Sequence, residues 1–342
     1  MNARPDLPDP DRIRDFLRDS AADTSPASQF RRLCAAGLDR IPFPGHGNTL
    51  LRWRMLAAVA AHDLATVKLY EGHTDALAIL AELGTTPPAG SLWGVWCAEP
   101  PTARLVIDGA PAPGATVRLG GIKAWCSGAA TVTHGLASAW DSDGKPWLVA
   151  VDMQQAGIDI DPGCWQAVGM ADTGTADIRF DGVQAECVGG SGAYLSRPGF
   201  WHGGAGIAAC WYGAAAELAH MLGAAGGEPD AHRLAYLGEV DCALASVRAL
   251  LHASATAIDA EPNADGMGLA MRARLSVENA AGIVMRNAGE ALGAGPFCRN
   301  RRFAQLMADL PVFLRQSHAR RDLAALGRLV HQRQGTYFGW AL

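Results

Sequence analysis

The middle third of this chain differs in texture from the two segments that flank it. Between residues 91 and 197, short β-branched or aromatic runs alternate with turns rich in glycine, proline and aspartate, a pattern typical of strands joined by turns. Residues 141–144 (DSDG) separate two such runs and predict a hairpin loop. The spacing of the runs predicts a small β-barrel or sandwich. The predicted strands are residues 92–97, 104–107, 116–119, 147–152 and 177–180.

The N-terminal flank, residues 1–90, has the pattern of helices. A short charged amphipathic segment covers residues 11–19, and prolines break the chain at residues 41–45. Apolar residues then recur at helical spacing over residues 50–83. This flank therefore predicts a helical domain.

The C-terminal flank is helical as well. Its candidate helices are residues 204–222, 233–258, 267–292 and 303–333. Short glycine- and proline-containing connections between them are typical of an antiparallel four-helix bundle. The sequence thus predicts an α+β fold of three domains. These are residues 1–90, 91–197 and 198–342.

Composition excludes several classes of protein. The formal net charge is −5, whereas a nucleic-acid-binding protein normally shows a basic face. The longest apolar stretch, residues 203–222, is interrupted by Glu217 and His220, so we expect no membrane helix. Residues 1–20 are charged and proline-rich, so we expect no signal peptide and a cytoplasmic location. The eight cysteines include no CxxC pair and predict reduced buried thiols and no metal site.

The standard catalytic motifs are absent from the sequence. It contains no GxSxG, no P-loop, no HExxH and no GxGxxG. If a dinucleotide binds to this chain, it therefore does so without a doubly wound sheet.

Five short motifs do follow one another in order. They are residues 96–100 (WCAEP), 121–128 (GIKAWCSG), 169–177 (GMADTGTAD, leading into a strand), 290–297 (EALGAGPF) and 305–309 (QLMAD). Together with the helix–β–helix layout, they resemble the acyl-CoA dehydrogenase family over roughly residues 55–330. The resemblance implies an N-terminal helical domain, here shortened, then a central β-barrel and a C-terminal four-helix bundle.

The resemblance also implies FAD, held between the β domain and the bundle and partly by a neighbouring subunit of a homodimer or homotetramer. Trp125 matches the family tryptophan that packs against the isoalloxazine and excludes water from it. Ser127 matches a residue that hydrogen-bonds the flavin edge, and the backbone of Cys97 and Ala98 matches the strand end at the pyrimidine side. The alternative is a tryptophan and a serine buried in an ordinary barrel.

Three further matches lie in the C-terminal helices. Gly293 matches a tight turn that lets the backbone approach the pyrophosphate or adenosine of FAD, and a simple helix C-cap is the alternative. Arg233 matches the arginine that meets the pyrophosphate, although its spacing is one residue longer; a solvated or ion-paired arginine is the alternative. Glu290 replaces a glutamine that often reaches FAD, and its carboxylate would repel the pyrophosphate unless it turns away or pairs with an arginine.

The catalytic base of the family is the main departure. Dehydrogenation needs a carboxylate to remove an acidified proton, and the matching position holds Ser317. Some relatives carry the base on the first bundle helix, but the matching residues 200–204 (FWHGG) include no carboxylate. His202 and His318 are the nearest titratable substitutes; for each, a hydrogen-bonded structural histidine is the alternative.

One polar cluster remains in the N-terminal flank. Glu71 and His73 are predicted to lie at the end of the long N-terminal helix. There they either line the substrate cavity, as the resemblance implies for this region, or cap the helix end.

Three functions are consistent with this sequence. The first is an FAD-dependent oxidoreductase acting on a small-molecule acyl thioester or related substrate, with a displaced or absent base and an unidentified electron acceptor. The second is a flavin-dependent monooxygenase of the same fold, which needs no carboxylate base. The third is a non-catalytic homologue.

Overall fold

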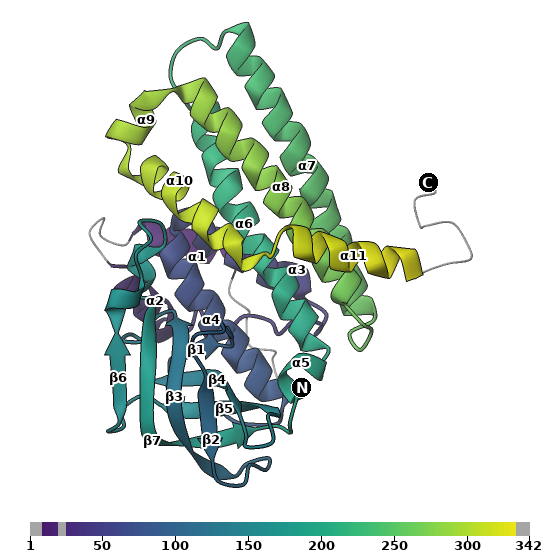
Figure 1. Cartoon of the computed structure of the whole chain (residues 1–342). Coiled ribbons are helices and arrows are strands. Elements are labelled where there is room, and N and C mark those ends of the chain that lie inside the picture. The colour runs from purple at the N-terminus through teal and green to yellow at the C-terminus, as the bar shows by residue number, and fades with distance from the viewer. Residues whose placement is uncertain (1–8, 20–24, 333–342) are drawn as a thin grey trace, which may run out of the picture. The chain divides into compact units, whose positions relative to one another are not determined.

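The computed structural model describes residues 9–19 and 25–332, which form two compact units. The first unit contains Met1–Phe43 and Asp63–Phe200, and the second contains Pro44–His62 and Trp201–Leu342. Figure 1 labels the elements of both units. The boundaries of the three domains expected from the sequence stay a prediction.

The helices of the first unit are α1 (Pro10–Arg18), α2 (Pro26–Ala35), α4 (Leu64–Glu82) and the short α5 (Ala193–Ser196). Asp9, Ser25 and Asp63 cap the first three of these helices by accepting backbone N–H groups with their side chains. The sequence pattern missed α2, and it merged α3 and α4 into one run over residues 50–83. Asp63 separates them, because its extended backbone ends one helix and its carboxylate starts the next.

Helix α4 corrects the expected position of Glu71 and His73. Both lie in the middle of the helix and are buried, so the prediction that they end a helix is wrong. Gly72 between them faces β1 (Trp93–Trp96), where a Cβ would lie 3.9 Å from the backbone nitrogen of Val95. A glycine here allows α4 to approach the strand closely without interrupting the helix.

The β domain is a closed barrel. Its strands are β1, β2 (Leu105–Asp108), β3 (Thr116–Cys126), β4 (His134–Trp140), β5 (Pro146–Asp152), β6 (Ile158–Asp161) and β7 (Ala176–Val188). Within the described residues, pairing runs from β4 through β5, β7, β3 and β2 back to β4. Strand β1 extends the circuit on β4, and β6 extends it on β7. The predicted barrel and the 141–144 hairpin are confirmed; β4 and β6 were not predicted.

The barrel packs against α4. Apolar side chains of α4 and of four strands form one buried cluster, made of Ala76, Ile79, Leu80, Trp93, Leu136, Leu148 and Val188. Two short 3₁₀ turns, η1 (Pro162–Cys164) and η2 (Ala171–Thr173), precede β7. This packing fixes the inner face of α4 against the strand that leads to residues 97 and 98.

The second unit is a helical bundle. It contains α3 (Thr49–His62), most of α6 (Gly199–Gly223), α7 (Ala231–Ala260), α8 (Met267–Leu292), α9 (Ala294–Arg299), α10 (Arg301–Phe313) and α11 (Arg320–Gln332). A Cβ at Gly213 would lie 2.3 Å from the carbonyl oxygen of Ala57, so α6 and α3 cross at backbone contact. Asp259 near the end of α7 accepts the Thr49 hydroxyl at 2.6 Å and its backbone N–H at 3.0 Å.

The last predicted helix is interrupted. The sequence predicts one helix over residues 303–333, but α10 ends in a 3₁₀ turn, η3 (Leu314–Gln316), and α11 starts anew at Arg320. Ala319 between them has a φ of +46°, a left-handed conformation that no helix interior adopts. Residue 333 lies outside the described part of the chain.

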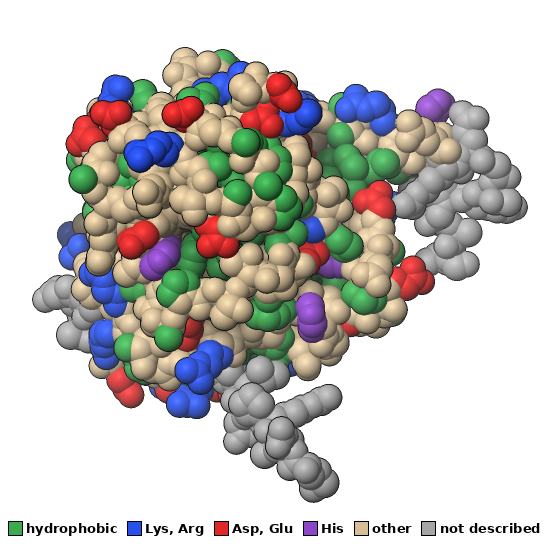
Figure 2. Space-filling model, turned by 90° about the horizontal axis from the view of Figure 1, so that it is seen from below, with side chains coloured by type: hydrophobic (Ala, Val, Ile, Leu, Met, Phe, Trp, Pro, Cys, Tyr) green, Lys and Arg blue, Asp and Glu red, His purple; other side chains and the backbone are tan. Residues whose placement is uncertain are grey.

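No helix within residues 9–19 and 25–332 is both long and apolar enough to cross a membrane. On the face of the molecule drawn in Figure 2, acidic and basic side chains are interspersed. This distribution accords with the small net charge of −5.

We predict that Gly135→Ala destabilises the barrel. Gly135 lies opposite Gly94 in the β1–β4 pair, and the buried Trp96 ring covers both. A Cβ at residue 135 would lie 2.2 Å from Cζ3 of that ring, and the ring cannot retreat because its Nε1 donates to the Ser127 carbonyl at 3.0 Å. Urea unfolding should show a free energy of unfolding lower by about 1–3 kcal/mol.

Gly190→Ala is the matched control, since nothing lies within 4 Å of its added Cβ. Equal unfolding free energies for the two variants would contradict the close packing of Trp96.

Candidate active site

The end of β3 turns Trp125 outward at a β-bulge. Lys123 pairs with Ile178 and Cys126 pairs with Ala176, so Ala124 and Trp125 together oppose the single residue Asp177. Trp125 has a φ of +59° and its side chain is 55% exposed. Bulges commonly re-aim a side chain beside a functional site. An exposed indole held in a strained conformation therefore marks this strand end as a candidate site.

Asp177 holds the bulge in place. Its Oδ1 accepts the backbone N–H of Trp125 at 3.0 Å, replacing a ladder bond that the bulge removes. Asp177 is the last residue of the 169–177 motif, but no role was predicted for it from the sequence. The structure assigns it the positioning of Trp125.

A line of hydroxyl groups lies next to the bulge. Ser127 Oγ is 3.0 Å from Thr175 Oγ1, which is 2.7 Å from Thr173 Oγ1. Thr173 in turn donates to the carbonyl of Met170 at 2.7 Å. Because that last donor is fixed, the hydroxyls form a directed hydrogen-bond chain. Thr173 and Thr175 were not predicted, although both belong to the 169–177 motif.

The end of β1 meets the end of β3. Trp96, the last paired residue of β1, donates its indole N–H to the Ser127 carbonyl at 3.0 Å. Cys97 and Ala98 follow directly and lie beyond the strand ladder. The structure therefore brings together the strand ends that carry Cys97, Ala98, Trp125 and Ser127, the four residues predicted from the β domain.

Cys97 is half-buried and lies near polar side chains. Burial raises the pKa of its thiol, although Lys123 and a hydrogen bond with Tyr194 oppose that rise. Burial also raises the pKa of Tyr194 well above its usual value. Both groups are therefore neutral hydrogen-bonding partners at physiological pH.

Arg233 is occupied by carbonyl groups of its own unit. Its guanidinium donates to the backbone oxygens of Gly226 at 3.1 Å and Leu222 at 3.2 Å, and also to that of Ala225. Leu222 lies in the last turn of α6 and the other two residues follow its end, so the side chain caps that helix. Among the described residues its buried Nε has no partner. A pyrophosphate contact for Arg233 stays a prediction.

Gly293 forms the expected tight turn. It joins α8 to α9 with φ +63° and ψ −160°, a combination reserved for glycine, and its N–H donates to the Gly289 carbonyl at 3.0 Å. Glu290, one turn earlier, is exposed. The C-cap role of Gly293 is thus present, while cofactor contacts of Gly293 and Glu290 stay predictions.

The three residues considered for the missing base differ in setting. His202 is 3% exposed, and its ring lies against Gly45 and Gly266. Ser317 is 4% exposed, and its Oγ accepts the N–H of Ala319 at 3.1 Å in the break before α11. His318 is exposed and its backbone N–H donates to Asp322. No catalytic role is tested for these residues.

Helix α4 carries a buried ionic group. Lys68 Nζ lies 2.9 Å from Glu71 Oε2, and the side chains are 17% and 7% exposed. Burial raises the pKa of Glu71 from 4.5 to about 7; Lys68 opposes this rise and Asp75 reinforces it. Glu71 was predicted from the sequence, whereas Lys68 and Asp75 were not.

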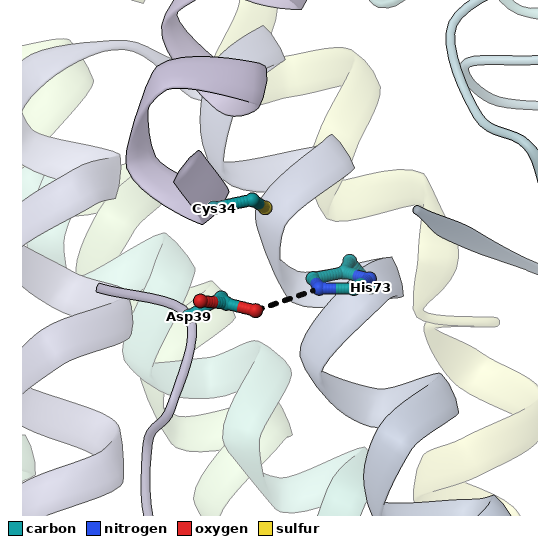
Figure 3. Close-up of side chains that lie close together, drawn as sticks. All are labelled: Cys34, Asp39 and His73. Atoms are coloured by element: carbon teal, nitrogen blue, oxygen red, sulfur yellow. Dashed lines mark hydrogen bonds and ion pairs between the residues drawn. The ribbon is translucent and has the colours of Figure 1, made fainter. Parts of the chain in front are cut away.

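Figure 3 shows a second cluster, made of Cys34, Asp39 and His73. Among the described residues their ligand atoms lie within 4.8 Å of one another, as in a metal site. However, His73 Nδ1 accepts the N–H of Trp93 at 3.1 Å, so the ring proton lies on Nε2 and is donated to Asp39 at 3.1 Å. A metal ion bound to Nε2 would displace the proton of that nitrogen. Nδ1 cannot take up this proton, because it already accepts the N–H of Trp93.

This cluster therefore has a structural role. His73 joins α4 to β1 through Trp93 and to the loop after α2 through Asp39. Burial, reinforced by the charge of Asp39, raises the pKa of the Cys34 thiol and keeps it protonated. Cysteine spacing along the sequence could not reveal this grouping.

We predict that Glu71→Gln changes how stability depends on pH. Below pH 4.5 Glu71 is protonated in both states, and between pH 4.5 and about 7 the folded state binds more protons than the unfolded state. The free energy of unfolding of the unaltered protein should therefore fall across this range and level off above it, by up to about 3 kcal/mol in total.

Urea unfolding at pH 5 and pH 8 measures this slope. Glu71→Gln should lack it, whereas Glu228→Gln, an exposed carboxylate control, should retain it. A slope that survives in Glu71→Gln would show that Glu71 is ionised throughout this range in the folded protein.

Comparisons with known proteins identify the fold. No protein-family model matches the chain, and no curated protein matches it. KijD3, solved with FMN and dTDP-3-amino-2,3,6-trideoxy-4-keto-3-methyl-D-glucose, is similar with a TM-score of 0.75 and 21% identity over 96% of this chain and 93% of that chain. TdsC from Paenibacillus sp. A11-2, a dibenzothiophene monooxygenase solved with FMN and indole, gives a TM-score of 0.74 and 17% identity over 95% and 94%.

Butyryl-CoA dehydrogenase from Megasphaera elsdenii gives a TM-score of 0.79 and 15% identity over 97% of this chain and 100% of that chain. Similarity over nearly the whole of each chain confirms the predicted order of N-terminal helices, central barrel and C-terminal helices. The chain therefore has the acyl-CoA dehydrogenase-like fold.

Proposed function

We propose that the protein is a flavin-dependent oxidoreductase, and specifically a monooxygenase that uses reduced flavin and dioxygen. The observation that carries the proposal is the bulge at the end of β3, which holds Trp125 exposed in a left-handed conformation. The enzymes named above with this fold support it, since two were solved with FMN and one is a monooxygenase.

The residues at this strand end fit a flavin. An isoalloxazine has apolar faces and a polar edge; the exposed indole of Trp125 offers a face to stack on, and the Ser127–Thr175–Thr173 hydroxyls offer hydrogen bonds for an edge. Asp177 keeps the indole in position. When bound, a reduced flavin supplies the electrons that activate dioxygen for insertion of one oxygen atom into a substrate.

We favour FMN over the FAD expected from the sequence. Both terminal nitrogens of Arg233 already donate to backbone carbonyls. Glu290 would place a negative charge where the family resemblance puts the FAD pyrophosphate. Neither residue therefore favours binding of the pyrophosphate, which joins the adenosine half of FAD to its flavin half.

Monooxygenation is favoured over dehydrogenation by the chemistry of residue 317. A serine whose Oγ accepts a backbone N–H is no base for an acidified proton. Residues 200–204 supply no carboxylate either. Oxygen insertion avoids this requirement. The acyl nature of the substrate and the homo-oligomeric state stay predictions.

We predict that Trp125→Ala weakens flavin binding about tenfold or more, because the stacking face is lost. Ser127→Ala should have a smaller effect, about that of one hydrogen bond. Fluorescence titration with FMN and, separately, FAD gives the Kd of each variant. Leu323→Ala, which removes an exposed apolar side chain on α11, is the control.

If Trp125→Ala binds flavin as tightly as Leu323→Ala does, the site is misplaced. If the unaltered protein binds neither FMN nor FAD, the non-catalytic homologue is the correct interpretation.

The reaction type has its own test. We predict that the protein loaded with oxidised flavin keeps its absorption spectrum when mixed with butyryl-CoA without oxygen, because no carboxylate stands at residue 317. Anaerobic titration should in turn show saturable binding of reduced FMN. Bleaching of the flavin by butyryl-CoA would instead establish a dehydrogenase.

A further inference from the structure

Three ionisable side chains lie on one face of α4. Lys68, Glu71 and Asp75 are three and four residues apart, the spacing that brings helix side chains together. Lys68 Nζ lies 2.9 Å from Glu71 Oε2, and the Asp75 carboxyl group, one turn further along the helix, raises the pKa of Glu71. We refer to these three residues as the α4 cluster.

The α4 cluster holds two carboxyl groups and one ammonium. Glu71 is 5% exposed, so its ionisation beside Asp75 would place like charges next to each other in a largely buried site. Burial and Asp75 therefore raise the pKa of Glu71 and favour its protonated form, and Lys68 opposes that rise.

Other ionisable groups lie on α4 and on the elements packed against it. Helix α4 itself carries His73. Strand β1 has none (WGVW); α2 carries Arg31, Arg32 and the thiol of Cys34, and η2 carries Asp172. Beyond β1 and on α5 stand Cys97 and Tyr194. The side chains that act on Glu71 are those of Lys68 and Asp75, and burial acts most strongly.

The α4 cluster reaches the candidate flavin site at two points. Lys68 and Gly72 line a cavity of about 10 Å³ that Ser127 also lines, which is room for about one water molecule. The charge of Asp75 acts on Tyr194, and Tyr194 hydrogen-bonds Cys97. The cluster is thus linked to both strand ends: to Ser127 after β3 through the cavity, and to Cys97 after β1 through Tyr194.

We propose that Glu71 is the proton-exchanging group of the flavin site, with Lys68 linking it to the cavity beside Ser127. This inference rests on the proposed function. In each cycle Glu71 gives one proton to the water that forms from dioxygen and regains one from solvent, so its own charge is restored; dioxygen is the oxidant and reduced flavin the reductant.

The first test needs neither flavin nor substrate. Infrared difference spectra of the full chain, recorded as pH is raised, should show a protonated-carboxyl band that disappears near pH 7. Glu71→Gln should lack this band and Glu228→Gln should keep it. If the unaltered protein shows no such band, the proposal is overturned, whether or not the variant folds.

The second test measures reoxidation of protein-bound reduced FMN by dioxygen in a stopped-flow instrument, as a function of pH. The rate of the unaltered protein and of Glu228→Gln should change near pH 7. Glu71→Gln should lose that change and be about a hundredfold slower at its optimum, with the Kd for FMN unchanged. Asp75→Asn, which leaves Glu71 without its carboxyl partner, should shift the profile to lower pH.

The outcomes separate the two proposals. If neither the unaltered protein nor any variant binds FMN, the proposed function is wrong. The infrared experiment still decides whether Glu71 is protonated, because it needs no flavin. Normal FMN binding with superimposable pH profiles for Glu71→Gln and the unaltered protein would remove the proton-exchange role alone.

Discussion

The barrel depends on one buried ammonium group. Lys123 of β3 is 1% exposed, and its Nζ contacts Glu99 Oε1 at 2.5 Å, Ser138 Oγ at 2.7 Å and the Ser138 carbonyl at 2.9 Å. A buried cation is tolerated only with such complete pairing, and removing one partner leaves the charge uncompensated. Because Glu99 follows β1 and Ser138 lies in β4, this one group fixes three strands together beside the candidate site.

The exposure of Trp125 follows from this attachment. Lys123 must point inward, yet two residues later the chain needs an outward indole and then the buried Cys126. A regular strand would place Lys123 and Trp125 on the same face. The bulge resolves the conflict by inserting one residue, and Asp177 compensates for the lost ladder bond with its side chain. The strained conformation of Trp125 thus arises because this strand end must keep Lys123 and Cys126 buried while it exposes the indole between them.

The sequence predicted the fold well where hydrophobic periodicity is strong. The 267–292 helix matches α8, and the barrel is where β-branched runs predicted it. Strand β4 was missed because HGLASAW is rich in small residues, which lack β-propensity and are selected here by the Trp96 ring lying over Gly135. The break at residues 317–319 was missed because a serine cap and a left-handed alanine leave no glycine or proline signal.

The candidate site was predicted in part, and the reason is physical. A matched motif locates residues such as Trp125 and Ser127, but it carries no information on what neutralises a charge in three dimensions. Lys68 and Asp75 have the sequence spacing of a solvated helix face and are half-buried, whereas Glu71 between them is buried by the packing of α4 on β1. Burial raises the pKa of Glu71, which the sequence spacing alone does not reveal. The missing carboxylate at residue 317 removes the base that would take a proton from a substrate, while burial of an ordinary side chain on α4 creates an acid–base group elsewhere in the chain.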